Sequence, residues 1–447
     1  MMAQNFSWKC PRSVAYVGLL LLALYAALQV LWPSVGDPAG TAMALFGLIA
    51  VLVWGKGLRG SAALWLLLAV IGVQILSWVL GYFHHPDWVS SNPEVDRLAK
   101  LFIFIGVAWW LGGSSRWTLA IWLLSLIGFL AATFVHGEGI QDWVTGLSGR
   151  RMDFGIRNAQ HSSMMFGTCL LGLLASSCRV FSYLGLGRSA LRLAWLALTL
   201  VCAMGVLMGQ TRAVWLALCV AIILIVAIRL LWLAKSHGAR HVLRSVVIIA
   251  CVLAVVGLGA AYVFKGHLSK RIEHGAASME MVAEGNFQDL PYDSVGTRLH
   301  TWVAAGEWIA ERPLVGWGGE GRGLVIDHTA WLPDNIKKRF GHLHNFFLEV
   351  WVAYGLLGVG VIAALAFWIG RGTWLAWRAG VMPGDIALFG ASFFVYWVIV
   401  NQFESYNSFW TGVYVHNLVV GGLVTHIWRW QLDTDRRVFS WPRRRDI

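Results

Sequence analysis

Two histidines stand directly before a long apolar run in the segment HLHNFFLEVWVAYGLLG, residues 342–358. If a membrane helix begins near His344, that residue lies in the first turn, where the partial positive charge of the helix end disfavours imidazolium. The same helix end favours an anionic ligand. A general base must be a neutral imidazole. His344 is therefore a candidate base, the alternative being an interfacial residue that caps the helix, and His342 and His300 are reserve candidates.

Arginines that could hold an anion lie in three segments. Arg212 stands in the turn MGQTRAVW before an apolar run, Arg298 lies in the long polar segment 265–343, and SGRRMDFGIRNAQHSS contains Arg150, Arg151 and Arg157. An arginine at membrane depth is costly unless it meets an anion or water. Guanidinium groups bind phosphate oxygens in a bidentate manner. A neutral base beside such arginines predicts glycosyl or phosphoryl transfer without a metal.

Other polar and glycine positions are open to more than one interpretation. Glu349 is the carboxylate inside a predicted span, where it is either a buried hydrogen-bonding partner or faces a water-filled cavity. Gly355 and Gly358 are expected to let a neighbouring helix approach. The segment GWGGEGRG, residues 316–323, has nucleotide-loop spacing but no preceding strand, so we expect a flexible turn or a close backbone approach to a ligand. The pair His342 and His344 has no third metal ligand in view, so no metal site and no cofactor are expected.

The composition is that of an all-α polytopic membrane protein. Of 447 residues, 58% are hydrophobic and 27 are Trp, and the mean hydropathy is +0.64. Runs long enough to cross about 30 Å of hydrocarbon predict about twelve transmembrane helices, near 14–32, 41–55, 61–82, 97–113, 116–136, 162–178, 189–208, 212–234, 242–264, 345–370, 384–402 and 410–428.

The distribution of Lys and Arg predicts the orientation. With Lys9 and Arg12 in the cytoplasm, most basic loops fall inside, whereas the outer loops 33–40, 83–96 and 403–409 contain no Lys or Arg. The net charge of +12 is explained in this way, without a nucleic-acid partner. We expect helices in 1–264, a periplasmic loop or lid over 265–343 with short helices near 268–285 and 296–312, helices in 344–430, and a basic cytoplasmic tail over 431–447.

The motif at the histidines resembles a known family. His344 and Asn345, nine further residues and then Gly355-Leu-Leu-Gly358 resemble the His-Asn/Ser/Gln-x9-GxxG pattern of the bacterial O-antigen ligase family. The number of spans, the long outer loop before the motif, GQTRAVW and TRLHTWVAAGEWIAERPLVGWG are similar to the wider O-antigen ligase and polymerase superfamily.

The resemblance implies a glycosyltransferase of the inner membrane with its active site at the periplasmic face. The donor would be O-antigen linked to undecaprenyl pyrophosphate, and the acceptor a sugar hydroxyl of lipid A-core. His344 would assist or orient the acceptor, Arg212 would hold the pyrophosphate, Arg298 would be a second phosphate contact, and the anomeric carbon would be inverted.

Three other functions remain open. An O-antigen polymerase uses the same donor with a lipid-linked glycan as acceptor, and a protein O-oligosaccharyltransferase uses Ser or Thr of a protein. A lipid-linked glycan transporter or flippase is the alternative of a different class. Against transport, the predicted spans have few ionisable residues at their centres and no evident internal repeat.

Overall fold

The computed structural model describes residues 8–237, 281 and 290–439, and every regular element in this part is helical. The all-helical prediction is confirmed. Nine of the described helices are long and apolar enough to cross a membrane, and they coincide with nine of the predicted spans: α1 (Arg12–Leu31), α2 (Pro33–Trp54), α3 (Ala62–His84), α6 (Ser115–Val135), α8 (Ala159–Ser182), α9 (Arg188–Gly209), α10 (Arg212–His237), α15 (Phe346–Arg378) and α16 (Gly384–Phe403).

The other three predicted spans have different outcomes. The stretch 97–113 forms α4 (Asp96–Ala99), η3 (Lys100–Phe102) and α5 (Phe104–Leu111) instead of one helix, and every residue of α5 is buried. The run 410–428 lies in α17 (Trp410–Thr434), a long helix that packs against α5 and α15 and is buried along most of its length. The run 242–264 lies outside the described residues. Hydropathy alone cannot separate an enclosed apolar helix from one that faces lipid.

One predicted outer loop is wrong. Residues 33–40 belong to α2, which begins at Pro33 directly after α1. Proline fits the first position of a helix because its missing N–H has no partner there in any case. The connection between α1 and α2 is therefore a sharp turn at Trp32.

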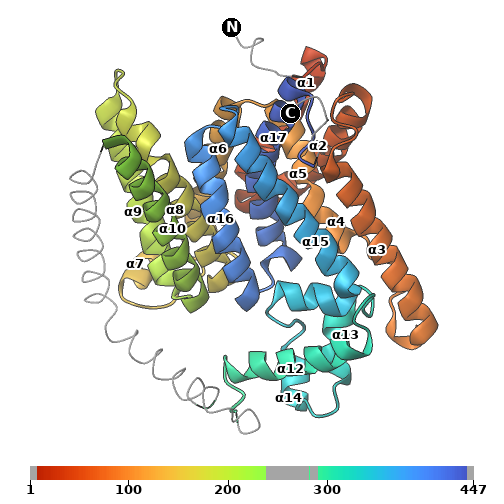
Figure 1. The fold of residues 1–447 in the computed structure, drawn as a ribbon. Coiled ribbons are helices and arrows are strands. Elements are labelled where there is room, and N and C mark those ends of the chain that lie inside the picture. Colours follow the sequence, from red (N-terminus) through yellow and green to blue (C-terminus); the bar gives the residue numbers. More distant parts are fainter. Residues whose placement is uncertain (1–7, 238–280, 282–289, 440–447) are drawn as a thin grey trace.

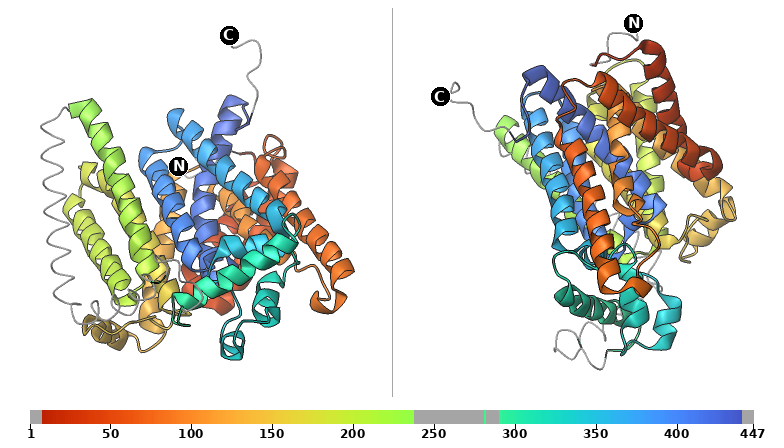
Figure 2. Two further views of the ribbon diagram at one scale, coloured as in Figure 1. Left: turned by 60° about the horizontal axis from the view of Figure 1, so that its bottom comes forward. Right: turned by 90° about the vertical axis from the view of Figure 1, so that its right-hand side faces the viewer.

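The segments that were predicted to share a side of the membrane lie at the same end of the bundle. The start of α1 and the end of α17 lie at one end, and α12 (Gly296–Glu311), α13 (Gly321–His328) and α14 (Asp334–Arg339) lie at the other (Figures 1 and 2). At the first end Arg371 donates a hydrogen bond to the carbonyl of Val438, 2.8 Å away. We call the opposite end, which carries α12–α14, the loop end.

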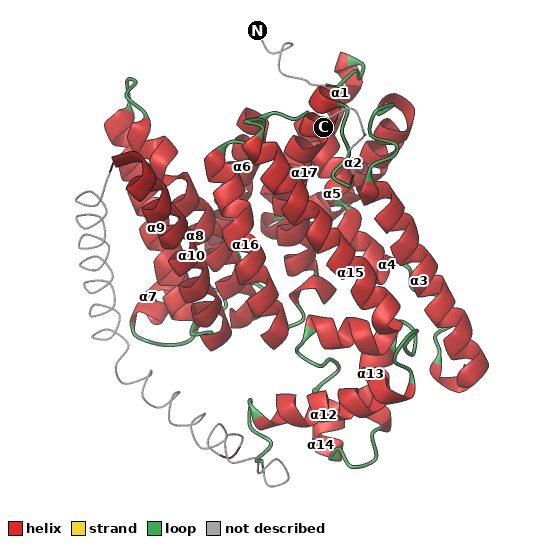
Figure 3. Ribbon diagram, viewed as in Figure 1, coloured by secondary structure: helices red, strands yellow, loops and turns green. Residues whose placement is uncertain are grey.

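Helices and turns at the loop end form a small layer with its own apolar core (Figure 3). The helix predicted over 296–312 is present as α12, whereas the one predicted over 268–285 falls almost entirely outside the described residues. Trp317, Leu324 and Leu343 are among the buried residues of this second core. The layer rests on α15, because the backbone N–H groups of Trp317 and Gly318 donate to the carbonyls of Val352 and Ala353 at 2.9 and 2.8 Å.

Helix α15 is kinked at Gly355. That residue has φ 62° and ψ −164°, a conformation essentially restricted to glycine. The loop before Gly316 contacts the kink, since the N–H groups of Leu356 and Leu357 donate to the carbonyls of Pro313 and Leu314 at 2.8 and 3.2 Å. The expected reason for the glycine was therefore wrong: its neighbour is the backbone of a loop, and not another helix. Of the two alternatives for 316–323, the structure shows a turn, with positive φ at Gly316 and Gly318, whose backbone lies against α15. Approach to a ligand stays a prediction.

Candidate functional site

Asn345 fixes the start of α15. Its side-chain carbonyl accepts hydrogen bonds from the N–H groups of Phe347 and Leu348 at 3.1 and 3.2 Å, which makes it the N-cap. Its side-chain amide donates to Gln402 at 3.1 Å, near the end of α16. His344 thus lies just before the cap with φ 52°, and not in the first turn as predicted. An ordinary residue in this left-handed region is uncommon and frequently marks a functional site.

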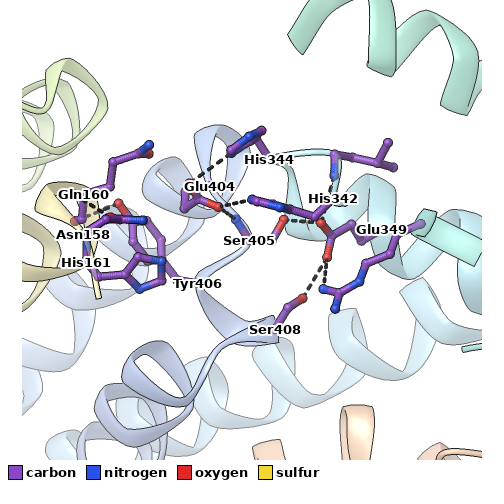
Figure 4. Close-up of polar contacts among 12 residues, drawn as sticks. Asn158, Gln160, His161, His342, His344, Glu349, Glu404, Ser405, Tyr406 and Ser408 are labelled. Atoms are coloured by element: carbon purple, nitrogen blue, oxygen red, sulfur yellow. Dashed lines mark hydrogen bonds and ion pairs between the residues drawn. The ribbon is translucent and has the colours of Figure 1, made fainter. Parts of the chain in front are cut away.

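A carboxylate joins the two histidines (Figure 4). Glu404 follows α16 and is 2% exposed. One of its oxygens lies 3.0 Å from Nε2 of His342 and the other lies 3.0 Å from Nδ1 of His344. The two imidazole rings are 4.0 Å apart. Sequence reasoning missed Glu404, although it is the sole acidic residue between Asp385 and Asp433 and interrupts two apolar runs.

These contacts fix the tautomer of each neutral histidine. A carboxylate can only accept, so His344 must donate from Nδ1, which leaves Nε2 free to accept a proton. Burial on its own raises the pKa of Glu404, but the hydrogen bonds and charges of His342 and His344 outweigh burial and hold that pKa below its usual range. Glu404 is therefore ionised at neutral pH and stabilises a protonated imidazole, as the acid of a catalytic triad does.

Glu349 connects the segment that contains the two histidines to the segment that contains Glu404. One of its oxygens accepts from the N–H of Leu343 at 3.1 Å and from the hydroxyl of Ser405 at 2.5 Å. The other accepts from the hydroxyl of Ser408 at 2.8 Å and from Arg322 at 3.3 Å. Leu343 lies between the two histidines, and Ser405 follows Glu404. Glu349 therefore holds the segment of the histidines and the segment of Glu404 together. It is a buried hydrogen-bonding partner, one of the two predicted alternatives, and it also lines a polar cavity.

Three of the predicted arginines lie near the histidine and carboxylate cluster. The Arg157 guanidinium lies 3.7 Å from the centre of the Phe409 ring, whose edge also meets His342. Burial lowers the pKa of Arg157, and the charge of Glu404 opposes this. Burial also lowers the pKa of Arg298. Repulsion from Arg212 lowers this pKa further, whereas attraction to Glu404 raises it. These effects place Arg157 and Arg298 near Glu404, and they place Arg212 near Arg298.

The electrostatics of this region favour an anion. Arg298 holds Ser294 through its carbonyl and hydroxyl, at 3.0 and 3.1 Å, whereas its Nε is buried without a hydrogen-bond partner in the described part of the chain. Arg212 begins α10 and is exposed, as its predicted place in a tight turn requires. A pyrophosphate is the kind of ligand that satisfies several guanidinium groups at once.

The remaining predicted residues are less closely connected to the cluster. Arg151 donates from Nε to the carbonyl of Gly209 at 3.1 Å, and its charge acts on buried Tyr406, so it lines the same region. Arg150 is exposed and makes no hydrogen bond or ion pair to a described residue. His300 belongs to a separate contact, bonded to the carbonyl of Leu290 at 3.0 Å and stacked on Tyr292. The structure does not bring Arg150 or His300 to the cluster.

A third histidine near the site was not predicted. His161 is buried in the first turn of α8, with Nδ1 2.5 Å from the hydroxyl of Thr411. Its ring meets the edges of Tyr406 and Phe409. The N-cap Asn158 precedes it and starts the helix. A polar NAQHSS stretch at the start of an apolar run was the available signal.

Three side chains have the spacing of metal ligands. Within the described residues, ligand atoms of His342, His344 and Glu404 all lie within 4.8 Å of one another. A cation there would have to replace both hydrogen bonds that Glu404 accepts from the imidazoles. The expectation of a metal-free site stays a prediction.

Comparison with known families bears on the same residues. Residues 196–363 match the model of the family described as O-antigen ligase. This range contains Arg212, Arg298, His342 and His344, whereas Glu404 lies beyond it. No curated protein matches the chain significantly. The matched domain, the helical bundle and the histidine motif support membership of this chain in the O-antigen ligase family.

Proposed function

We propose that this protein is an O-antigen ligase, which transfers assembled O-antigen from undecaprenyl pyrophosphate to a sugar hydroxyl of lipid A-core. The observation that carries the proposal is His344, held by Glu404 at 3.0 Å beside a group of arginines at the loop end. In this proposal the protein lies in the inner membrane and the loop end faces the periplasm. The chain is divided into membrane helices in 1–264, a periplasmic loop over 265–343, membrane helices in 344–430 and a cytoplasmic tail over 431–447.

The first part of the reaction is removal of a proton from the acceptor. The free Nε2 of His344 accepts the proton of the sugar hydroxyl as its oxygen attacks the anomeric carbon. Glu404 stabilises the imidazolium that forms and keeps the ring in its orientation. His342 shares the same carboxylate, so it restricts Glu404 to one position.

The second part is departure of the lipid pyrophosphate. The bond between the anomeric carbon and the phosphate oxygen breaks, and undecaprenyl pyrophosphate leaves with an additional negative charge. This charge is neutralised by Arg212, Arg298 and Arg157. The buried groups exclude part of the water from the site, which strengthens the electrostatic attraction. One displacement of this kind inverts the anomeric carbon, and it requires neither a metal nor a covalent intermediate.

The alternatives differ in the acceptor and can be separated in cells. The protein is expressed in bacteria that lack their own ligase but make lipid-linked O-antigen and a compatible core, and lipopolysaccharide is resolved on a gel. We expect a ladder of O-antigen on core, which is lost with His344→Ala or Arg212→Ala at normal membrane levels. Extended glycan that remains on undecaprenyl pyrophosphate, in cells without a polymerase, would instead identify a polymerase, and glycan on protein an oligosaccharyltransferase.

A further inference from the structure

A polar cavity lies beside the histidine and carboxylate cluster. Its volume is about 280 Å³, and it is enclosed by the segment around α4, the start of α13 and the first part of α15. Its lining includes three carboxylates and three cations, namely Glu94, Asp96, Glu349, Arg97, Lys100 and Arg322. We call it the charge-balanced cavity.

Two of the three cations of this cavity, Arg97 and Arg322, are already paired with carboxylates of the protein. Arg97 pairs with Glu94 at 2.9 Å and with Glu320 at 2.8 Å, and Arg322 pairs with Glu349 at 3.3 Å. Lys100 donates to the carbonyl of Ser408 at 3.3 Å. The other side of the cluster, where Arg157 lies, has an excess of arginine. An anion is therefore favoured on the arginine side, and a neutral ligand with many donors and acceptors is favoured in the cavity.

One buried hydroxyl of the lining lacks a partner. Tyr354 is 2% exposed, lines the cavity, and its hydroxyl has no hydrogen bond to any residue that the structure describes. Buried polar groups are nearly always hydrogen-bonded, so an unsatisfied hydroxyl that lines a cavity is consistent with a ligand or a water molecule in that cavity. The nearby charged groups point to a ligand that both donates and accepts.

The cavity is directly connected to the catalytic groups. Glu349 lines it and accepts hydrogen bonds from Ser408, which also lines it, and from Ser405, which follows Glu404. A ligand there lies one side chain away from the His344 and Glu404 pair. Small-molecule pockets begin at about 300 Å³, so this volume suits a fragment the size of a sugar ring.

We propose that the charge-balanced cavity binds the acceptor sugar whose hydroxyl attacks the donor, with Tyr354 and Lys100 as acceptor-binding residues. This inference rests on the proposed function. Sugar hydroxyls donate to the carboxylates of Glu94 and Glu349 and accept from Lys100 and from the hydroxyl of Tyr354. The donor pyrophosphate occupies the arginine side, so the two substrates meet at His344 from opposite sides.

The kinetic test uses Tyr354→Phe and Lys100→Gln in purified protein in lipid nanodiscs. The Tyr354 hydroxyl has no hydrogen-bond partner among the described residues, so its removal should leave folding intact. With O-antigen-free lipopolysaccharide as acceptor, we expect the acceptor KM to rise about three- to tenfold for each variant, the effect of one lost hydrogen bond. The donor KM and kcat should stay within a factor of two or so of wild type. Thr373→Val removes another unpartnered buried hydroxyl from α15, outside the cavity, and should leave the acceptor KM unchanged.

A binding test separates this inference from the proposed function. Isothermal calorimetry measures binding of dephosphorylated core oligosaccharide to the protein without donor, and we expect wild type to bind and Tyr354→Phe to bind several-fold more weakly. If wild type transfers glycan but both variants have the same acceptor KM and the same affinity for the oligosaccharide as wild type, the cavity assignment is overturned. If wild type binds the oligosaccharide in this way but transfers nothing, the proposed function fails and the cavity stands. Displacement of the oligosaccharide by millimolar inorganic phosphate would show an anion site and overturn the assignment.

Discussion

The Nδ1 atom of His344 lies 3.0 Å from a carboxylate oxygen of Glu404, a residue 60 positions further along the chain. The other oxygen of the same carboxylate lies 3.0 Å from Nε2 of His342. This shared acceptor sets the tautomers of both imidazoles and directs the free nitrogen of His344 away from the carboxylate. The relationship supports the proposed base function of His344, which its position before a helix alone does not explain.

Glu404→Gln should disable transfer while the fold is kept. The amide can donate as well as accept, so it no longer enforces donation from Nδ1 of His344 or stabilises imidazolium. We expect kcat to fall on the order of 10²–10⁴, with little change in either KM. Steady-state transfer by the purified protein measures this. Glu311→Gln, at an exposed position, is the control and should behave as wild type. Wild-type kcat in Glu404→Gln would remove Glu404 from the mechanism.

The stability contributed by Glu404 should depend on pH in one direction. Its pKa in the folded protein lies below that of an ordinary glutamate, near 4.3 when unfolded. A depressed pKa contributes stability above the unfolded value and loses it as pH falls through the folded value. The difference in melting temperature between wild type and Glu404→Gln should therefore not shrink between pH 8 and 5, and should shrink below about pH 4. A difference that vanishes already at pH 6 contradicts the depressed pKa.

Arg212→Lys should be severely impaired although its charge is preserved. A lysine ammonium cannot bind two phosphate oxygens in the planar, bidentate way of a guanidinium. The loss of one electrostatic contact to a developing charge costs on the order of 10²–10³ in rate. Arg116→Lys, an exposed arginine at the start of α6, provides a matched substitution away from the site. Quantitative ligation at the wild-type level by Arg212→Lys would refute the bidentate contact.

Gly355→Ala should destabilise the protein. A Cβ at Gly355 would lie 2.1 Å from the carbonyl carbon of Leu314, and φ 62° is unfavourable for alanine. Strain of this backbone type alone costs about 1–3 kcal/mol, so the melting temperature in detergent and the yield of folded protein should fall. Gly360→Ala is the matched control on the same helix, because no atom lies within 4 Å of its added Cβ. Equal stability of the two variants would show that the kink is not required.

Local sequence signals predicted a large part of this arrangement. Hydropathy located most of the long helices, Pro313 and the apolar spacing located α12, and the turn before α10 located Arg212. Long-range contacts had no such signal. Glu404 approaches the histidines only because α16 returns the chain to the loop end. Gly355 likewise meets a loop that lies far from it in sequence, at Pro313 and Leu314. The burial of α5 likewise depends on helices distant in sequence.

The most direct test of the central claim is transfer by the purified protein. Undecaprenyl pyrophosphate-linked glycan and O-antigen-free lipopolysaccharide are supplied in nanodiscs with excess EDTA, and the product is analysed by mass spectrometry and by NMR of the new linkage. We expect glycan joined to the core with inverted anomeric configuration, in a reaction that EDTA does not diminish and that His344→Ala abolishes. Transfer that stops with EDTA and returns with a divalent metal, or a linkage with retained configuration, would contradict this expectation.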